Sequence, residues 1–484
     1  MNRRQFLTGS AAAAVSMGRG VAEQPPNIIL ILADDQGYGD LGCYGSPHIR
    51  TPNIDRMARE GARFTDFYAQ PMCGPSRAAI LTGCYPVRNS LMFNHIPRAR
   101  TGIHPNEVTM AELLKHRGYS TMIVGKWHLG DAPPFRPMRH GFDEWFGLPY
   151  SNDMWPYHPK VRTPEPEHPR LTAARKRAEM TGYDGQGQTY PANWFPDLPL
   201  MSNDEVVELN PDQSRLTERY CDAALGFIRR NRAKPFFLYL AHSMPHAPLF
   251  AGKQFEGRSL RGRYGDAVEE IDASTGRIVS LLKELGLSGR TLVIYTSDNG
   301  PWAPYGIDAG SAGPLRGAKG STLEGGMRVP MVAWWPGRIA AGNVTSEVAA
   351  SIDFLPTFGK LAGAGPPKQG AIDGRDIWPL MSQPGAHSPH DAFYYFEGSI
   401  QYRADQGRPR NLVNLRAIRK GKWKLHLAGQ DEALTGTELY DLYQDAGEAK
   451  NVMASNGEVK RQLEAMARNF DAEFRKEIRP LGTL

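Results

Sequence analysis

The segment from Cys73 to Gly83 brings a sulfur atom, a hydroxyl group and a guanidinium within five residues. It begins Cys-Gly-Pro-Ser-Arg and runs on into the apolar residues 78–81. Proline is favoured in the first turn of a helix, so the segment predicts a helix that begins near Cys73. Free backbone N–H groups at a helix start attract an anion. The pattern therefore predicts a nucleophile beside an anion site, although a lone cysteine is more often a small buried hydrophobe.

Carboxylate and amide side chains follow two apolar runs of the chain. Asp34 and Asp35 come directly after residues 27–33, and Asp298-Asn299 follows residues 291–296. Apolar runs of this length are typical of strands in a parallel sheet, and ligands bind at the carboxyl ends of such strands. Oxygen ligands suit a hard divalent cation. A solvated turn is the alternative for each pair, because Asp-Asn-Gly is also a common turn.

Basic and imidazole side chains follow further strand-like runs. Lys126 and His128 stand two residues apart, which places them on one side of an extended segment. His246 follows residues 235–241, and Lys319 lies in a glycine-rich stretch. Each of these residues alone is compatible with a surface lysine or a packed histidine, and His242 has no role that the pattern indicates.

The elements that would position these side chains alternate between strand and helix patterns. Predicted strands cover residues 27–33, 119–125, 235–241, 291–296 and 331–335, and predicted helices cover 53–61, 107–117, 214–232, 264–285 and 354–361. This alternation predicts an α/β fold with a mixed, mainly parallel sheet flanked by helices.

Two parts of the chain depart from that alternation. Residues 149–211 lose periodicity and are rich in Pro, Gly and aromatic residues, which favours binding loops. Trp155, Tyr157 and His158 could line a sugar or aryl pocket there, with ordinary loop packing as the alternative. Beyond a boundary near residue 385, residues 412–427 predict a small antiparallel ribbon and residues 459–478 a closing helix. The predicted parts are thus a catalytic domain, residues 23–385, and a C-terminal subdomain, residues 386–484.

Composition and the N-terminus limit the class of protein. Of 484 residues, 41% are hydrophobic and 22% charged, which indicates a globular chain with a sizeable core. The formal charge of +6 includes three arginines within residues 1–22, so the remainder does not call for nucleic acid. Residues 1–22 begin Met-Asn-Arg-Arg-Gln-Phe-Leu and resemble a twin-arginine export leader, which predicts a periplasmic or secreted bacterial protein that uses the twin-arginine machinery. No later run is long and apolar enough to predict a transmembrane segment.

The sequence Cys73 to Gly83 resembles the signature of the type I, formylglycine-dependent sulfatases, in the branch of arylsulfatase A and N-acetylgalactosamine-6-sulfatase. The run Gly125-Lys-Trp-His-Leu-Gly130, with His140-Gly-Phe-Asp-Glu-Trp-Phe-Gly147, resembles the second signature of that family. One position departs from the pattern, because the family usually continues Leu-Thr-Gly-Arg where this chain has Cys84. The resemblance implies an alkaline-phosphatase-like α/β fold with a smaller C-terminal antiparallel sheet.

The resemblance also implies roles for the candidate residues. Cys73 would be oxidised to formylglycine by a formylglycine-generating enzyme, and its hydrate would attack sulfur. One calcium ion would be bound by Asp34, Asp35, Asp298, Asn299 and residue 73. Arg77 would hold the formylglycine, Lys126 would contact the sulfate, and His128 would contact the formylglycine and take a proton. His246 or Lys319 would protonate the leaving alcohol.

The expected function is hydrolysis of an aryl sulfate or a sulfated sugar, with a small-molecule or glycan sulfate ester as substrate. Two alternatives stay open. A phosphatase or phosphodiesterase of the alkaline phosphatase superfamily commonly uses Ser or Thr and two metals, whereas Cys73 and Asn299 favour a one-metal sulfatase. If Cys73 stays a thiol, the alternative function is non-catalytic binding of sulfated glycans.

Overall fold

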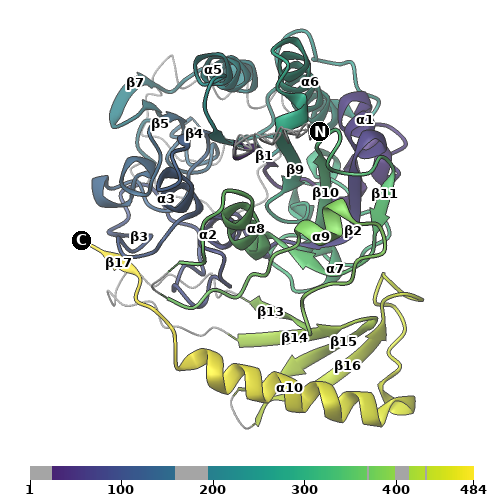
Figure 1. The fold of residues 1–484 in the computed structure, drawn as a ribbon. Helices are drawn as coiled ribbons and strands as arrows, with labels where there is room; N and C mark the ends of the chain where they lie inside the picture. Colours follow the sequence, from purple (N-terminus) through teal and green to yellow (C-terminus); the bar gives the residue numbers. More distant parts are fainter. Residues whose placement is uncertain (1–23, 158–194, 368–369, 398–413, 431–432) are drawn as a thin grey trace, which may run out of the picture.

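The computed structural model describes residues 24–157, 195–367, 370–397, 414–430 and 433–484. The predicted leader and His158 lie outside these residues. A large mixed sheet forms the centre, and a smaller antiparallel sheet with one long helix packs below it in Figure 1. The α/β class and the small C-terminal sheet that the sequence predicts are confirmed.

The large sheet has eleven strands, ordered β11-β2-β10-β9-β1-β8-β4-β5-β6-β7, with β12 paired to β2. Its central strands β9, β1, β8, β4 and β5 run parallel, whereas β10 pairs antiparallel with both β9 and β2. The strands are β1 Asn27–Ala33, β2 Ala62–Tyr68, β4 Ser120–Gly125, β5 Glu144–Gly147, β6 Pro199–Ser202, β7 Glu205–Leu209, β8 Phe236–Ala241, β9 Thr291–Ser297, β10 Arg328–Trp334, β11 Asn343–Thr345 and β12 Ala349–Ala350.

Helices cover both faces of this sheet, because its central strands are apolar on both sides. In β1, Ile29 and Ile31 contribute to one core while Ile28 and Leu30 contribute to the other. Helix α6 contacts both α1 and α5 over the first core, and α2, α3 and α8 pack together over the second. The helices are α1 Pro52–Glu60, α2 Cys73–Thr82, α3 Met110–Lys115, α5 Leu216–Arg230, α6 Gly262–Glu284, α7 Glu324–Met327, α8 Phe354–Leu361 and α9 Trp378–Ser382.

The C-terminal sheet has the order β13-β14-β15-β16, and α10 packs against three of its strands. A third apolar core joins it to α2 and to the strand β2. A last short pair, β17 with β3, returns the chain end to the main body (Figure 1). These elements are β3 Thr101–Gly102, β13 Phe393–Glu397, β14 Asn414–Lys420, β15 Trp423–Ala428, β16 Thr435–Asp441, α10 Gly457–Arg475 and β17 Gly482–Thr483.

Two sequence predictions need correction. The helix predicted over residues 107–117 is shorter, because Thr109 and Glu112 form a capping box that starts α3 at Met110. The prediction that residues 149–211 lack regular structure is wrong for residues 199–209. There β6 and β7 form an antiparallel hairpin that extends the large sheet beyond β5. Among the helices of the described residues, none is both long and apolar enough to cross a bilayer.

Candidate active site

The carboxyl ends of the parallel strands β1, β9, β8 and β4 lie at one edge of the large sheet. Each strand is followed by candidate residues, and α2 begins at Cys73 on the same edge. The contacts and electrostatic interactions of the structure bring all ten predicted site residues into one buried cluster: Asp34, Asp35, Cys73, Arg77, Lys126, His128, His246, Asp298, Asn299 and Lys319. The parallel register explains this convergence, because parallel strands end at the same edge.

Cys73 lies in the middle of this cluster. Its Sγ is 3.4 Å from Asp34 Oδ1 and 3.6 Å from Asp35 Oδ1, and Lys319 Nζ lies 3.1 Å from the sulfur. Burial raises the pKa of the Cys73 thiol well above its ordinary value, and the negative charge of Asp34 adds to the effect. The sulfur is therefore a neutral thiol near pH 7, which is a weak nucleophile.

Three basic side chains bind the carboxylates around Cys73. Lys126 Nζ lies 2.5 Å from Asp34 Oδ2, and Lys319 Nζ lies 2.7 Å from Asp35 Oδ1. Arg77 donates to Asp298 Oδ2 at 2.9 Å and to the carbonyl of Lys126 at 2.7 Å. Arg77 thus ties the first turn of α2 to the ends of β9 and β4, which fixes Cys73 relative to the strand ends.

The acidic residues fit a divalent cation. Burial, followed by the charge of Asp34, raises the pKa of Asp298 to about 7, so the nearby cations Arg77 and Lys126 do not offset burial and the neighbouring carboxylate. Within the described residues, Asn299 Oδ1 is buried without a hydrogen-bond partner, while its Nδ2 donates to Asp35 Oδ1 at 2.7 Å. A half-turn of the amide exchanges these two atoms. Ligand atoms of Asp34, Asp35, Cys73 and His246 all lie within 4.8 Å of one another, so the geometry adds His246 to the possible metal ligands.

His128 differs from the charged residues because neither ring nitrogen has a hydrogen-bond partner in the part of the chain that the structure describes. Burial, together with the positive charges of Lys126 and Arg77, lowers the pKa of His128 well below its ordinary value. Its backbone is left-handed, with φ of 67°, as is that of Asp35, with φ of 62°. Such conformations are uncommon for residues other than glycine, with Asp and His among the types that adopt them most often, and they are concentrated at functional sites.

Sequence reasoning missed three side chains at this site. Ser151 Oγ accepts from Lys126 Nζ at 3.2 Å and lies 3.4 Å from His246 Nε2, so it bridges two candidates. His95 is buried and interacts electrostatically with His128. The ring of Trp302 lies 4.5 Å from Lys319 Nζ and its centroid 5.5 Å from that of His246. No signal in the sequence marked these residues, since all three lie in loops without a periodic pattern.

Other candidates lie elsewhere. His242 is buried, burial lowers its pKa to about 3, and its ring has no hydrogen bond to any described residue. Trp155 packs in the core edge-to-face on Phe250 and on Tyr157, at 6.1 and 5.5 Å between ring centroids. This arrangement agrees with the packing alternative for these two aromatic residues.

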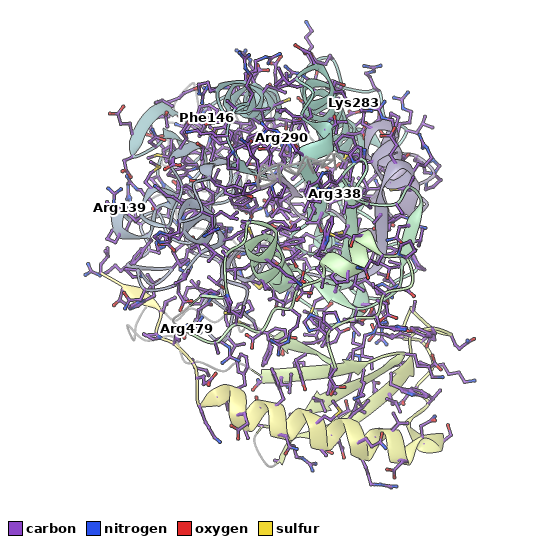
Figure 2. All side chains as sticks on the ribbon, in the orientation of Figure 1. Arg139, Phe146, Lys283, Arg290, Arg338 and Arg479 are labelled. Atoms are coloured by element: carbon purple, nitrogen blue, oxygen red, sulfur yellow. The ribbon has the colours of Figure 1, made fainter. Side chains whose placement is uncertain are left out.

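Cys84, the position that departs from the sulfatase signature, lies at the opposite end of α2 from Cys73. Arg479 Nη2 lies 3.3 Å from its sulfur and 2.8 Å from Glu107 Oε2. Figure 2 shows Arg479 between the main body and the C-terminal helix. The guanidinium of Arg479, from the C-terminal segment, therefore lies next to Cys84, the position at which the family usually has an arginine of its own. None of the four cysteines, all within the described residues, forms a disulfide.

Comparisons with known proteins identify the family of this chain. The Sulfatase family model matches residues 26–364, and the model for the C-terminal part of N-sulphoglucosamine sulphohydrolase matches residues 319–473. N-acetylgalactosamine-6-sulfatase of Rattus norvegicus is 43% identical over 439 residues, which cover 88% of this chain and 76% of that protein. Arylsulfatase A of Bos taurus is 40% identical over 482 residues, with 93% and 89% covered.

A solved structure gives the same result. The crystal structure of Ps i-CgsB in complex with k-i-k-neocarrahexaose superposes with a TM-score of 0.74 at 31% identity, and 93% of each chain is covered. The extent of these matches, together with the cluster around Cys73, shows that the chain belongs to the sulfatase family, the enzymes that hydrolyse sulfate esters.

Proposed function

We propose that this sulfatase acts with a formylglycine at position 73 and one calcium ion, and that its substrate is the sulfate ester of a sugar or a phenol. The observation that carries the proposal is the position of Cys73 Sγ, between the carboxylates of Asp34 and Asp35 and the ammonium of Lys319. Three acidic side chains (Asp34, Asp35 and Asp298) and three basic ones (Arg77, Lys126 and Lys319) surround it, so their formal charges cancel before a substrate binds. A cation is needed to offset the negative charge that the sulfate ester adds.

Asp34, Asp35, Asp298 and Asn299 would hold the calcium ion. The donor set consists of carboxylate and amide oxygens, which suits calcium better than zinc. The unpartnered Asn299 Oδ1 and the raised pKa of Asp298 support a cation at this place. Bound calcium would supply positive charge that polarises the sulfate group.

The buried, neutral Cys73 thiol would be a poor nucleophile in these surroundings, so hydrolysis at this site calls for a modified side chain at position 73. Formylglycine would supply a hydroxyl nucleophile as its hydrate. Around it, Arg77 holds the start of α2 in place through Asp298 and the Lys126 carbonyl. Lys126 and Ser151 lie side by side and present an ammonium and a hydroxyl to the sulfate oxygens.

Proton transfers fall to His128 and to the pair Lys319 and His246. The unpartnered ring of His128 can accept a proton from the nucleophile. The Lys319 ammonium lies 3.1 Å from Sγ and can donate to the leaving oxygen, and His246 Nε2 lies 3.4 Å from Asp35, the carboxylate that also binds Lys319. The Trp302 ring contacts both donors, so the leaving alcohol would lie beside it.

A sulfated sugar is the substrate class that the relatives favour. The rat relative is named for N-acetylgalactosamine 6-sulfate, and Ps i-CgsB binds a neocarrahexaose. A small cavity of about 10 Å³ next to the cluster, which is the size of about one water molecule, is lined by Trp302, Tyr264, Tyr305 and Asp308. We also propose that residues 1–22 direct export, which a lysine pair in place of Arg3 and Arg4 would block.

The proposal is tested by mass spectrometry of the peptide that contains Cys73, since the aldehyde and the thiol differ in mass. The same preparation is assayed with an aryl sulfate and an aryl phosphate after chelation and addition of calcium or zinc. We expect an aldehyde and a calcium-dependent sulfatase. A thiol in fully active enzyme would overturn the formylglycine, zinc-dependent phosphatase activity would favour the phosphatase alternative, and a thiol with sulfated-glycan binding but no turnover would favour the binder.

A further inference from the structure

The segment that carries Lys319 is bound by residues that lie outside the edge of the large sheet where the catalytic cluster is found. We define the Lys319 loop as residues 316–324, which connects η7 (Ala303–Asp308) and the following turns to α7. Its middle contacts the catalytic side, because Lys319 N donates to the Pro301 carbonyl at 2.9 Å and Gly320 N donates to the Pro71 carbonyl at 2.7 Å. Gly317 and Gly320 both have positive φ, at 90° and 88°, so two glycines let the loop turn tightly.

Both ends of the Lys319 loop are bound to the C-terminal sheet. At its start, Arg316 Nη1 donates to the backbone carbonyl of Glu448 at 2.9 Å. At its end, Lys424 Nζ donates to the Thr322 carbonyl at 2.9 Å, and Glu324 N donates to Glu448 Oε2 at 2.7 Å. Lys424 belongs to β15, and Glu448 follows β16. Two residues of the C-terminal sheet therefore fix both ends of a loop whose middle reaches the nucleophile.

The side chains that make these contacts form a closed buried network. Lys424 Nζ is 2.9 Å from both Glu324 Oε1 and Glu448 Oε1, and all three side chains have no exposed surface. Tyr68 and Tyr395 donate to the two oxygens of Glu324 at 2.6 and 2.9 Å, and His426 Nε2 lies 2.7 Å from Glu448 Oε1. A buried ion pair costs desolvation and holds only in good geometry, so it fixes positions more than it adds stability.

We propose that Lys424 and Glu448 are positioning residues for Lys319, so that the C-terminal sheet is part of the catalytic apparatus. The inference rests on the proposed function in which Lys319 protonates the leaving oxygen. Within the described residues, neither Lys424 nor Glu448 contacts Cys73 or the acidic cluster, and each acts on the chemistry through the loop. Loss of either residue lets the loop move and misaligns the ammonium from the leaving oxygen.

The test uses Glu448→Gln, which keeps the shape and the backbone carbonyl of residue 448, and Lys424→Met, which removes the ammonium. Lys422→Met is the matched control, because Lys422 pairs with Asp441 at 2.6 Å on the same sheet, and this pair lies at the partly exposed surface. kcat is measured with aryl sulfates whose phenols differ in pKa. A misplaced proton donor matters most for basic leaving groups. We expect Glu448→Gln to lower kcat about 10- to 100-fold for the most basic phenol and less than about 3-fold for nitrophenol.

Two further measurements separate failure of this inference from failure of the proposed function. Hydrogen exchange of residues 317–323 should speed up in Glu448→Gln and stay unchanged in Lys422→Met, whatever Lys319 does chemically. In a Lys319→Ala background, Glu448→Gln should add no further dependence on the leaving group, since coupled residues are not additive.

The outcomes divide as follows. Unchanged exchange in the loop, or an equal loss of kcat for all leaving groups, overturns the positioning role. Full additivity with Lys319→Ala also overturns it. If Lys319→Ala itself shows no leaving-group dependence while Glu448→Gln speeds up loop exchange, the role of Lys319 in the proposed function fails and the anchoring by the C-terminal sheet stands. Should Lys424→Met fail to fold, Glu448→Gln alone decides.

Discussion

Two buried clusters of charged side chains contact the same short segment of chain, the Lys319 loop. The catalytic cluster surrounds Cys73, and the docking cluster consists of Glu324, Lys424 and Glu448 with Tyr68 and Tyr395. In the docking cluster every carboxylate oxygen has a partner within the network. In the catalytic cluster, Asn299 Oδ1 and both nitrogens of His128 have no partner among the described residues.

The catalytic cluster therefore has polar atoms that a ligand can still bind, whereas the carboxylates of the docking cluster already have their partners within the protein. Burial and charge density are alike in both clusters, so neither identifies function. The unpartnered polar atoms distinguish these two clusters, because leaving such atoms buried costs about 1–3 kcal/mol each unless a ligand or water binds them. The predictions below substitute comparable groups in the two clusters and ask whether activity or stability responds.

The largest effect is expected for Cys73→Ala in the catalytic cluster. It removes the precursor of the nucleophile, so turnover of an aryl sulfate should fall by at least about 10⁴-fold. The Tm should stay within a few degrees, since the site is not optimised for stability. Cys221→Ala, at a buried thiol of α5 away from the site, is the control and should keep activity. Near-normal hydrolysis by Cys73→Ala would sink the proposed mechanism.

The second prediction compares one charge removal in each cluster. Lys424→Met removes the one ammonium that contacts both buried carboxylates, Glu324 and Glu448, and should cost about 3–5 kcal/mol of unfolding free energy. Asp298→Asn should cost less than Lys424→Met, because the pKa of Asp298, raised to about 7 by burial and Asp34, indicates that the fold disfavours this charge despite its ion pair with Arg77. Denaturant unfolding without calcium measures both.

Activity should rank the two variants in the opposite order. Compared at equal folded fraction, Asp298→Asn should be the less active variant, although Lys424→Met is the less stable. Asp298→Asn should abolish the rise in Tm that calcium gives the wild type, whereas an unchanged calcium response would remove Asp298 from the metal site. If Asp298→Asn proves the more destabilising of the two, the distinction between the clusters is wrong.

The sequence predicts the catalytic cluster but not the docking cluster. The catalytic cluster follows from local patterns, since each carboxylate or lysine comes directly after an apolar run and parallel strands end together. The central strands and α8 agree with their predicted ranges to within a few residues. All ten candidate residues converge for this reason.

The docking cluster was not predicted, because Glu324, Lys424 and Glu448 are each separated by long stretches of chain and sit in no motif. Only the three-dimensional packing of β15 against α7 brings them together. Ser151 and Trp302 were missed for the same reason, since a loop residue gains its neighbours from tertiary contacts. The hairpin β6–β7 shows a related limit, because its pairing with β5 overrides weak local patterning.

The docking cluster also predicts a response to acid. Burial alone would raise the pKa of Glu448, but Lys424 and other partners lower it below the ordinary value, and the pKa of Glu324 is lowered in the same way. The stabilising effect of such lowered pKa values is fully present above about pH 4.5 and is lost as pH falls through the native values. Glu448→Gln should therefore reduce the slope of unfolding free energy against pH below about pH 4.5, by up to about 1.4 kcal/mol per pH unit.

Denaturant unfolding at a series of acid pH values measures that slope. Glu205→Gln, at an exposed residue of β7, is the control and should leave the slope as in the wild type. An equal slope in wild type and Glu448→Gln would mean that Glu448 titrates alike in the folded and unfolded chains, which contradicts a complete network.

The smallest effect is expected at the border of the catalytic cluster, where Trp302 covers the two proposed proton donors. If the leaving alcohol lies beside this ring, Trp302→Ala should lower kcat/KM for a sulfated sugar about 10-fold, the usual contribution of one apolar pocket contact. Inhibition by inorganic sulfate should not change, because sulfate has no leaving group to place there. Ile307→Ala, at a side chain 81% exposed in η7, is the matched control and should change neither value. A loss of sulfate affinity in Trp302→Ala would instead mean that the ring holds Lys319 in place through their 4.5 Å contact, and Trp302 would then belong with the residues that complete the catalytic cluster.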